Sequence, residues 1–126
     1  IAAPWVGGNY DGEDFFAFGP DNSGLKRVTA PILTFFGTKD DVTLASFILP
    51  ATRKLSGPSY VVELVDQPHV FEDGSWQDRD NWEMLFFSAY LKNNPASLAT
   101  LKTGRSMKGG NENLQLFDYQ GKHESA

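Results

Sequence analysis

The fold of this chain is decided by two short runs, PILTFFGTKDD at residues 31–41 and YVVELVDQPH at residues 60–69. Residues 32–36 are apolar except for Thr34 and rich in β-branched and aromatic side chains, and Gly37 closes the run. Residues 60–65 form a second such run, in which Glu63 is the one charged residue. Apolar runs of this length are typical of strands buried on both faces of a parallel sheet. The two runs therefore predict adjacent parallel strands of an α/β fold.

A carboxylate and a histidine follow these two strands. Asp40 comes just after the turn that begins at Gly37, and His69 comes just after the second strand, 29 residues further along the chain. That separation is enough for one crossover helix and a return strand. Because parallel strands end at the same edge of a sheet, where α/β folds place their sites, the two side chains could meet.

Composition and charge exclude several classes of protein. The chain has 126 residues, 40% of them hydrophobic and 21% charged, which is enough for one folded domain and argues against disorder throughout. The net charge of −5 argues against nucleic acid as a partner, because phosphate binding needs a clustered basic surface. No apolar run approaches the roughly 20 residues of a membrane span. Without cysteine, the sequence holds neither a disulfide nor a thiolate metal site.

The segments before the first strand indicate a strand end, a turn and a lid. Residues 1–6 resemble the end of a buried strand and have no basic n-region, so they are not a signal peptide, and we expect the chain to begin in the middle of a fold. Residues 7–12 are rich in residues that tolerate positive φ, which indicates a turn. Residues 13–18 could be one helical turn or an extended lid segment, and residues 19–24 are a loop by composition.

Helices are expected after the acidic turn. Thr43 is a plausible N-cap for a helix towards residue 55, and Pro50 must kink that helix or restart it. Asp80 followed by Glu83 is a capping-box pattern in front of a second helix. Apolar residues at helical spacing would lay that helix on the sheet: Trp82, Leu85, Phe86, Ala89 and Tyr90.

The end of the chain predicts a short helix and a strand. Pro95 is well placed as the first residue of a helix to residue 101. From residue 103 the chain becomes polar, and residues 114–119 could form a last edge strand.

At these residues the chain resembles the C-terminal half of an α/β-hydrolase. The matching features are the strand-Gly-x-x-Asp turn that ends at Asp40, the strand-loop-His that ends at His69, and Ala3-Pro4-Trp5 at a strand end. The resemblance covers roughly residues 1–101. It is strongest to the dienelactone-hydrolase-like branch, which also includes bacterial cutinase-like polyester hydrolases.

The resemblance implies serine-dependent hydrolysis of an ester, either a small molecule or a polymer. His69 would be the general base, and Asp40 would hold its imidazole in the correct tautomer. The family places the acid third after the glycine, which selects Asp40 over Asp41; Asp66 lies only three residues before His69. Trp5 would line the substrate cleft.

The sequence departs from the family at the nucleophile, because no Gly-x-Ser-x-Gly occurs in the 126 residues. The resemblance therefore implies that the serine and the oxyanion hole come from an N-terminal half of the fold, on the same or a separate chain. Residues 1–102 would be the C-terminal portion of the hydrolase domain, with about three parallel strands and flanking helices. Residues 103–126 would be a polar extension. No cofactor or metal is expected, since one histidine beside two aspartates is a poor metal site.

A non-catalytic role stays open. Asp40 with Asp41 could be a solvated turn and helix cap, His69 a loop histidine, and Trp5 a core or rim residue. The chain would then be an α/β domain that binds a partner or contributes structure to an assembly. The sequence leaves the substrate, the oligomeric state and the compartment open, although the resemblance leans towards a secreted protein.

Overall fold

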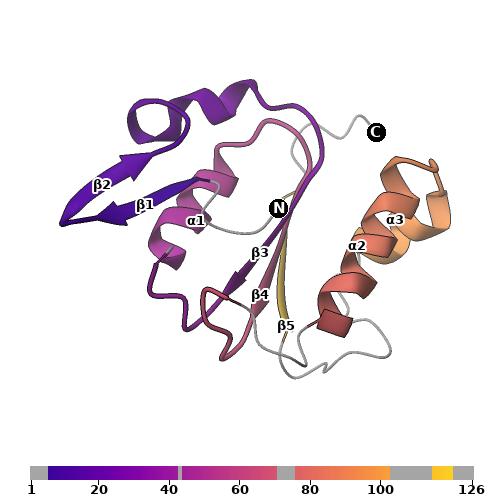
Figure 1. Cartoon of the computed structure of the whole chain (residues 1–126). Coiled ribbons are helices and arrows are strands. Elements are labelled where there is room, and N and C mark those ends of the chain that lie inside the picture. Colours follow the sequence, from indigo (N-terminus) through magenta and orange to yellow (C-terminus); the bar gives the residue numbers. More distant parts are fainter. Residues whose placement is uncertain (1–5, 43, 71–75, 103–114, 121–126) are drawn as a thin grey trace.

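A computed structural model describes residues 6–42, 44–70, 76–102 and 115–120, with the backbone alone at residues 9, 10, 76 and 115–120. Figure 1 shows a three-stranded sheet with α1 on one face, α2 and α3 on the other, and a separate two-stranded hairpin. The elements in chain order are β1 (Gly7–Tyr10), β2 (Glu13–Phe16), the 3₁₀ helix η1 (Pro20–Arg27), β3 (Ile32–Gly37), α1 (Ala45–Arg53), β4 (Ser59–Leu64), α2 (Trp76–Tyr90), α3 (Pro95–Lys102) and β5 (Gln115–Gln120).

The three-stranded sheet places β4 between β3 and β5. β3 and β4 are parallel, with Ile32 opposite Ser59 and Gly37 opposite Leu64. β5 runs antiparallel to β4 along its other side. This strand falls where residues 114–119 could form an edge strand, and it makes part of the polar C-terminal segment a member of the central sheet.

The α/β class is confirmed, whereas a sheet of about three parallel strands is not shown. The described sheet has two parallel strands, and its third member is antiparallel. The further parallel strand expected at residues 1–6 lies outside the described residues except for Val6, which is fully buried in a turn. A strand at the edge of a sheet can run antiparallel without a crossover helix, which is why an apolar run alone does not fix its direction.

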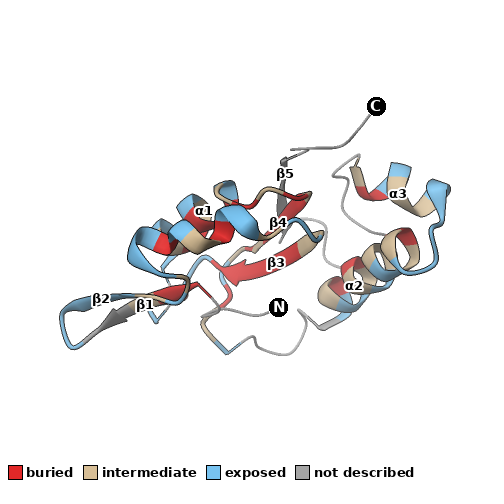
Figure 2. Ribbon diagram, turned by 90° about the horizontal axis from the view of Figure 1, so that it is seen from above, coloured by how far each residue is buried: buried red, intermediate tan, exposed pale blue. Residues whose placement is uncertain are grey.

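Both faces of β3 and β4 are buried, as Figure 2 shows by their red colour. Side chains alternate between the two faces along a strand. One face packs on α2 and α3 through a cluster of Leu33, Phe35, Tyr60, Val62, Leu64, Trp82, Ala89 and Leu101. The other packs on α1 and η1 through Val6, Leu25, Phe36, Ile48, Ala51, Leu55 and Val61. Two-sided burial explains why these strands have nearly continuous apolar sequences.

β1 and β2 form an antiparallel hairpin in which Tyr10 is opposite Glu13. Asp11 and Gly12 connect the strands with φ values of 51° and 80°. Two positive φ values in a two-residue loop are the hairpin arrangement that Asp-Gly favours. The prediction of a turn over all of residues 7–12 was therefore wrong for residues 7–10. For residues 13–16 the extended alternative is correct and the helical one is not.

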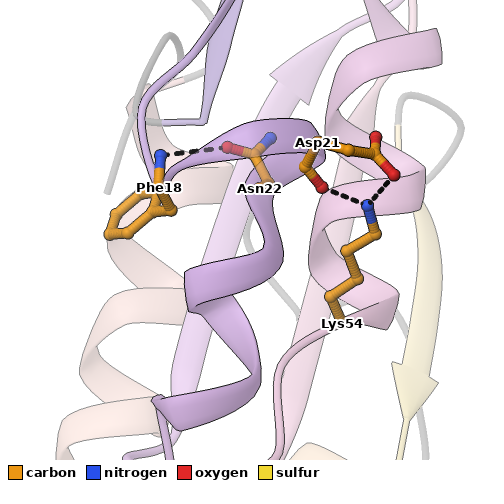
Figure 3. A network of polar contacts seen from close by, with 4 residues as sticks. All are labelled: Phe18, Asp21, Asn22 and Lys54. Carbon is orange, nitrogen blue, oxygen red and sulfur yellow. Dashed lines mark hydrogen bonds and ion pairs between the residues drawn. The ribbon is translucent and has the colours of Figure 1, made fainter.

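η1 occupies the region that composition indicated to be a loop. Asp21 and Asn22 have positive φ values of 50° and 54°, so two helical pieces meet at a kink. Figure 3 shows what holds the kink: the buried Asn22 accepts the Phe18 N–H at 3.1 Å, and Lys54 pairs with the Asp21 carboxylate at 2.9 Å. Lys54 also donates to the Asp21 carbonyl. Aspartate and asparagine tolerate the left-handed region better than most residues, which is why this kink can form.

α1 continues through Pro50 without a restart. The proline removes one intrahelical hydrogen bond, but in a nine-residue helix only the Ser46 carbonyl is affected. Leu44 occupies the N-cap position without a side-chain hydrogen bond, and the expected cap Thr43 lies outside the described residues.

α2 begins at Trp76, four residues before the expected cap. Asp80 and Glu83 therefore lie inside the helix, and the capping-box prediction was wrong. The prediction of an apolar stripe is confirmed, since Trp82 and Ala89 are buried against the sheet with Leu85, Phe86 and Tyr90 beside them. The helix expected at residues 95–101 is α3.

A buried hydroxyl in β3 provides a test of this packing. Thr34 is fully buried, and within the described residues its Oγ1 has no hydrogen-bond partner. We expect Thr34→Val to raise the free energy of unfolding by about 1 kcal/mol, because it removes an unpaired polar atom without changing the shape of the side chain. Urea unfolding measures this change.

Thr52→Val is the matched control. Thr52 is equally buried, but its hydroxyl donates to the Leu49 carbonyl at 3.1 Å. The same substitution there should lower the free energy of unfolding. If both variants lose stability equally, Thr34 is satisfied and the packing described for β3 is wrong.

Candidate active site

The turns that follow β3 and β4 are joined by backbone hydrogen bonds. The Thr38 N–H donates to the Leu64 carbonyl at 3.1 Å, and the Lys39 N–H donates to the Gln67 carbonyl at 3.0 Å. Because Gly37 and Leu64 are opposite each other in the sheet, both turns start at the same level. The two loops therefore form one structure at the carboxyl edge of the sheet.

Gly37 is needed for this close approach. A Cβ atom at this position would lie 2.0 Å from the Gln67 carbonyl oxygen, far closer than two such atoms can come. Gln67 is itself buried. The absence of a side chain at the end of β3 thus allows the histidine loop to pack directly on the strand end.

Asp40 lies inside this structure with its carboxylate almost fully buried, its side chain being 1% exposed. Oδ1 accepts the Val42 N–H at 2.9 Å, and Oδ2 contacts Nδ1 of His69 at 3.0 Å. Since both carboxylate oxygens are engaged by groups on different segments, the orientation of the carboxylate is fixed.

His69 is more open to solvent, with 27% of its side chain exposed. An ionised carboxylate can only accept hydrogen bonds, so with Asp40 ionised the Nδ1–H of His69 donates a hydrogen bond to Oδ2. In the neutral imidazole the lone pair is then on Nε2. The pair thus has the arrangement of an acid that orients a base, with the base reachable from outside.

The expectation that the side chains of Asp40 and His69 meet is confirmed by this 3.0 Å contact. The rival carboxylates are placed differently. Asp41 is exposed, and Asp66 forms an exposed ion pair with Lys39 at 3.3 Å. Trp5 lies outside the described residues, so its role in substrate binding stays a prediction.

Sequence reasoning missed Thr38, Gln67 and the part played by Gly37. A glycine at the end of a strand was visible, but its contact with a residue thirty positions later depends on the register of the two strands. No pattern in the sequence specifies that register.

Two cavities lie away from the pair. One of about 310 Å³ is between β2, η1 and α1, and one of about 300 Å³ is between β3 and α2. Neither is lined by Asp40 or His69.

Across the described residues, no three histidine, aspartate or glutamate side chains are grouped closely enough to hold a metal ion. No helix of the described part is both long and apolar enough to cross a membrane.

Comparison with protein-family models and with curated protein sequences finds no match to this chain.

The contact between the two turns can be tested through Gly37. We expect Gly37→Ala to lower the free energy of unfolding by about 1–3 kcal/mol, because the added methyl group forces apart the strand end and the Gln67 backbone. Urea unfolding measures the stability, and the NMR signals of His69 should shift as its contact with Asp40 is lost.

Gly12→Asn is the control for this substitution. Gly12 has a φ of 80°, which strains any side chain but asparagine less than most, and nothing lies within 4 Å of a Cβ placed there. Its loss of stability should therefore be smaller than that of Gly37→Ala, and the His69 signals should not shift. A Gly37→Ala protein as stable as Gly12→Asn, with unchanged His69 signals, would contradict the close packing of the two turns.

Proposed function

We propose that this chain supplies the acid and the base of a serine hydrolase of the α/β-hydrolase type, and that the reaction is hydrolysis of a carboxylic ester. The observation that carries the proposal is the 3.0 Å contact between a nearly buried Asp40 carboxylate and the Nδ1 of a partly exposed His69. The contact is formed at the carboxyl edge of two adjacent parallel strands, where α/β enzymes hold their catalytic groups.

In the proposed reaction His69 acts through Nε2. It takes the proton of a serine hydroxyl as the serine oxygen attacks the ester carbonyl carbon, and then gives that proton to the departing alcohol. A water molecule next loses a proton to Nε2 while its oxygen attacks the acyl-enzyme carbonyl. The proton returns to the serine oxygen as the carboxylic acid leaves. Asp40 remains ionised throughout and stabilises the imidazolium.

In this proposal the nucleophile comes from residues outside this sequence, on another chain or another part of a longer protein, and by the family resemblance so does the oxyanion hole. No serine in the sequence has the flanking glycines of a nucleophile elbow. Within the described part of the chain, the hydrogen-bond partner of His69 is Asp40 and not a serine. The cavity of about 300 Å³ between β3 and α2 is a candidate contact surface for such a partner, because it is lined mainly by apolar residues of these two elements.

We expect the isolated chain to hydrolyse esters no faster than free imidazole at the same concentration, since without the serine no serine acyl-enzyme can form. Turnover of p-nitrophenyl esters measures this. Joined to the segment that supplies the serine, the protein should become active, and His69→Ala should then lower kcat by about 10⁴-fold or more.

Asp40→Asn should cause a similar loss, because the amide can stabilise the wrong tautomer of His69. Asp41→Asn is the matched control, since this exposed neighbour should leave kcat within a few-fold of the original. Ester turnover by the isolated chain that is much faster than turnover by free imidazole, and that depends on His69, would overturn the proposed division of the triad. Equal effects of the two aspartate substitutions would remove Asp40 from the mechanism.

A second function is favoured by exposed apolar residues on α2 and directly after it. Met84 and Phe87 of α2 are 68% and 49% exposed, and Leu91, one residue beyond the helix, is 74% exposed. Three such side chains, spaced at helical intervals, would suit a non-catalytic domain that binds another protein. In that case His69→Ala would leave partner binding unchanged, and no assembly containing the chain would hydrolyse esters.

A further inference from the structure

One side-chain hydroxyl adds to the backbone hydrogen bonds that join the loop of His69 to the loop of Asp40. The Asp66 N–H donates to Oγ1 of Thr38 at 2.7 Å. Thr38 stands two residues before Asp40, and Asp66 stands three residues before His69. This short hydrogen bond therefore links the two loops close to both members of the pair.

Such a link supports the conformation of the Asp66 backbone. Its φ is 63°, in the left-handed region, which aspartate tolerates better than most residues but still adopts at some energetic cost. Contacts from the surroundings therefore help to hold this conformation. The Thr38 hydroxyl holds the amide of Asp66, while Lys39 pairs with its carboxylate at 3.3 Å. Both side chains of that ion pair are about two-thirds exposed, so it constrains the loop weakly.

We propose that Thr38 is a positioning residue for the acid and base pair. By accepting the Asp66 N–H, its hydroxyl fixes the direction in which the chain leaves Asp66, and thereby keeps Nδ1 of His69 within hydrogen-bond distance of the Asp40 carboxylate. The catalytic consequence rests on the proposed function. The effect on the pair itself does not, because the contact exists in this chain without the serine.

NMR of the 126-residue chain tests the proposal directly. Thr38→Val keeps the shape of the side chain but removes the hydroxyl, and Thr38→Ser keeps the hydroxyl. We expect Thr38→Val to lose the low-field signal of the His69 Nδ1 proton and to mix the two imidazole tautomers. Thr38→Ser should retain the signal and a single tautomer. In Thr38→Val the Asp66 amide should exchange with solvent at least about tenfold faster.

Lys39→Ala is the matched control, because it removes the exposed ion pair with Asp66 but leaves the Thr38 hydroxyl in place. It should keep the low-field signal. If Thr38 contributed only to stability, Thr38→Val would lower the unfolding temperature without changing the tautomer, and the proposal would be overturned. If Lys39→Ala loses the signal of the His69 Nδ1 proton while Thr38→Val keeps it, the Lys39–Asp66 ion pair positions His69 and the Thr38 hydroxyl does not.

If Thr38→Val fails to fold, amide exchange of the unaltered chain tests whether the Thr38 hydroxyl binds the Asp66 amide. The proposal requires the Asp66 amide to be protected relative to that of the exposed Asp41, and equal exchange rates would overturn it. These measurements need no enzyme activity. The proposed function fails separately, if the assembled protein does not hydrolyse esters or does so without His69.

Discussion

The parallel pairing of β3 with β4 sets where the covering helices pack and where the two loops of the candidate site begin. With Gly37 opposite Leu64, the two strands end level, and the chain leaves both at the same edge of the sheet. A shift of this register by one residue would turn every side chain of one strand to the other face. The contact between Asp40 and His69 exists because apolar side chains on both faces prevent such a shift.

The helices fix the register by covering the sheet from two sides. Phe36 and Val61 pack towards α1, whereas Phe35 and Val62 pack towards α2. Neither strand could present its other face without placing a different set of side chains in each core. The core residues on the two faces of the sheet thus set the geometry of the site. The polar loops add the hydrogen bonds that align the Asp40 carboxylate with the His69 imidazole.

Sequence reasoning found the parts of the molecule that local patterns specify. The two apolar runs predicted β3 and β4, the apolar spacing predicted the buried stripe of α2, and the positions of Asp40 and His69 after the two strands predicted their contact. It failed where tertiary context decides. The start of α2 at Trp76 overrides a capping pattern, and the antiparallel direction of β5 depends on how the chain returns to the sheet.

The hairpin is a different kind of failure, because Asp11-Gly12 is a signal that could have been used. The two residues were interpreted as part of a longer turn, although they form a two-residue loop between short strands. The joined turns at the site had no comparable signal. Thr38 and Asp66 are ordinary loop residues in the sequence, and only the level strand ends bring them together.

The difference in burial between the Asp40–His69 contact and the Lys39–Asp66 ion pair determines how each responds to ionic strength. Asp40 is shielded from solvent, whereas both members of the Lys39–Asp66 pair are well exposed. Mobile ions screen exposed charges strongly and buried ones much less. Added salt therefore weakens the Lys39–Asp66 attraction while leaving the Asp40–His69 contact nearly unchanged, and the alignment of the imidazole is the salt-resistant part of this edge of the sheet.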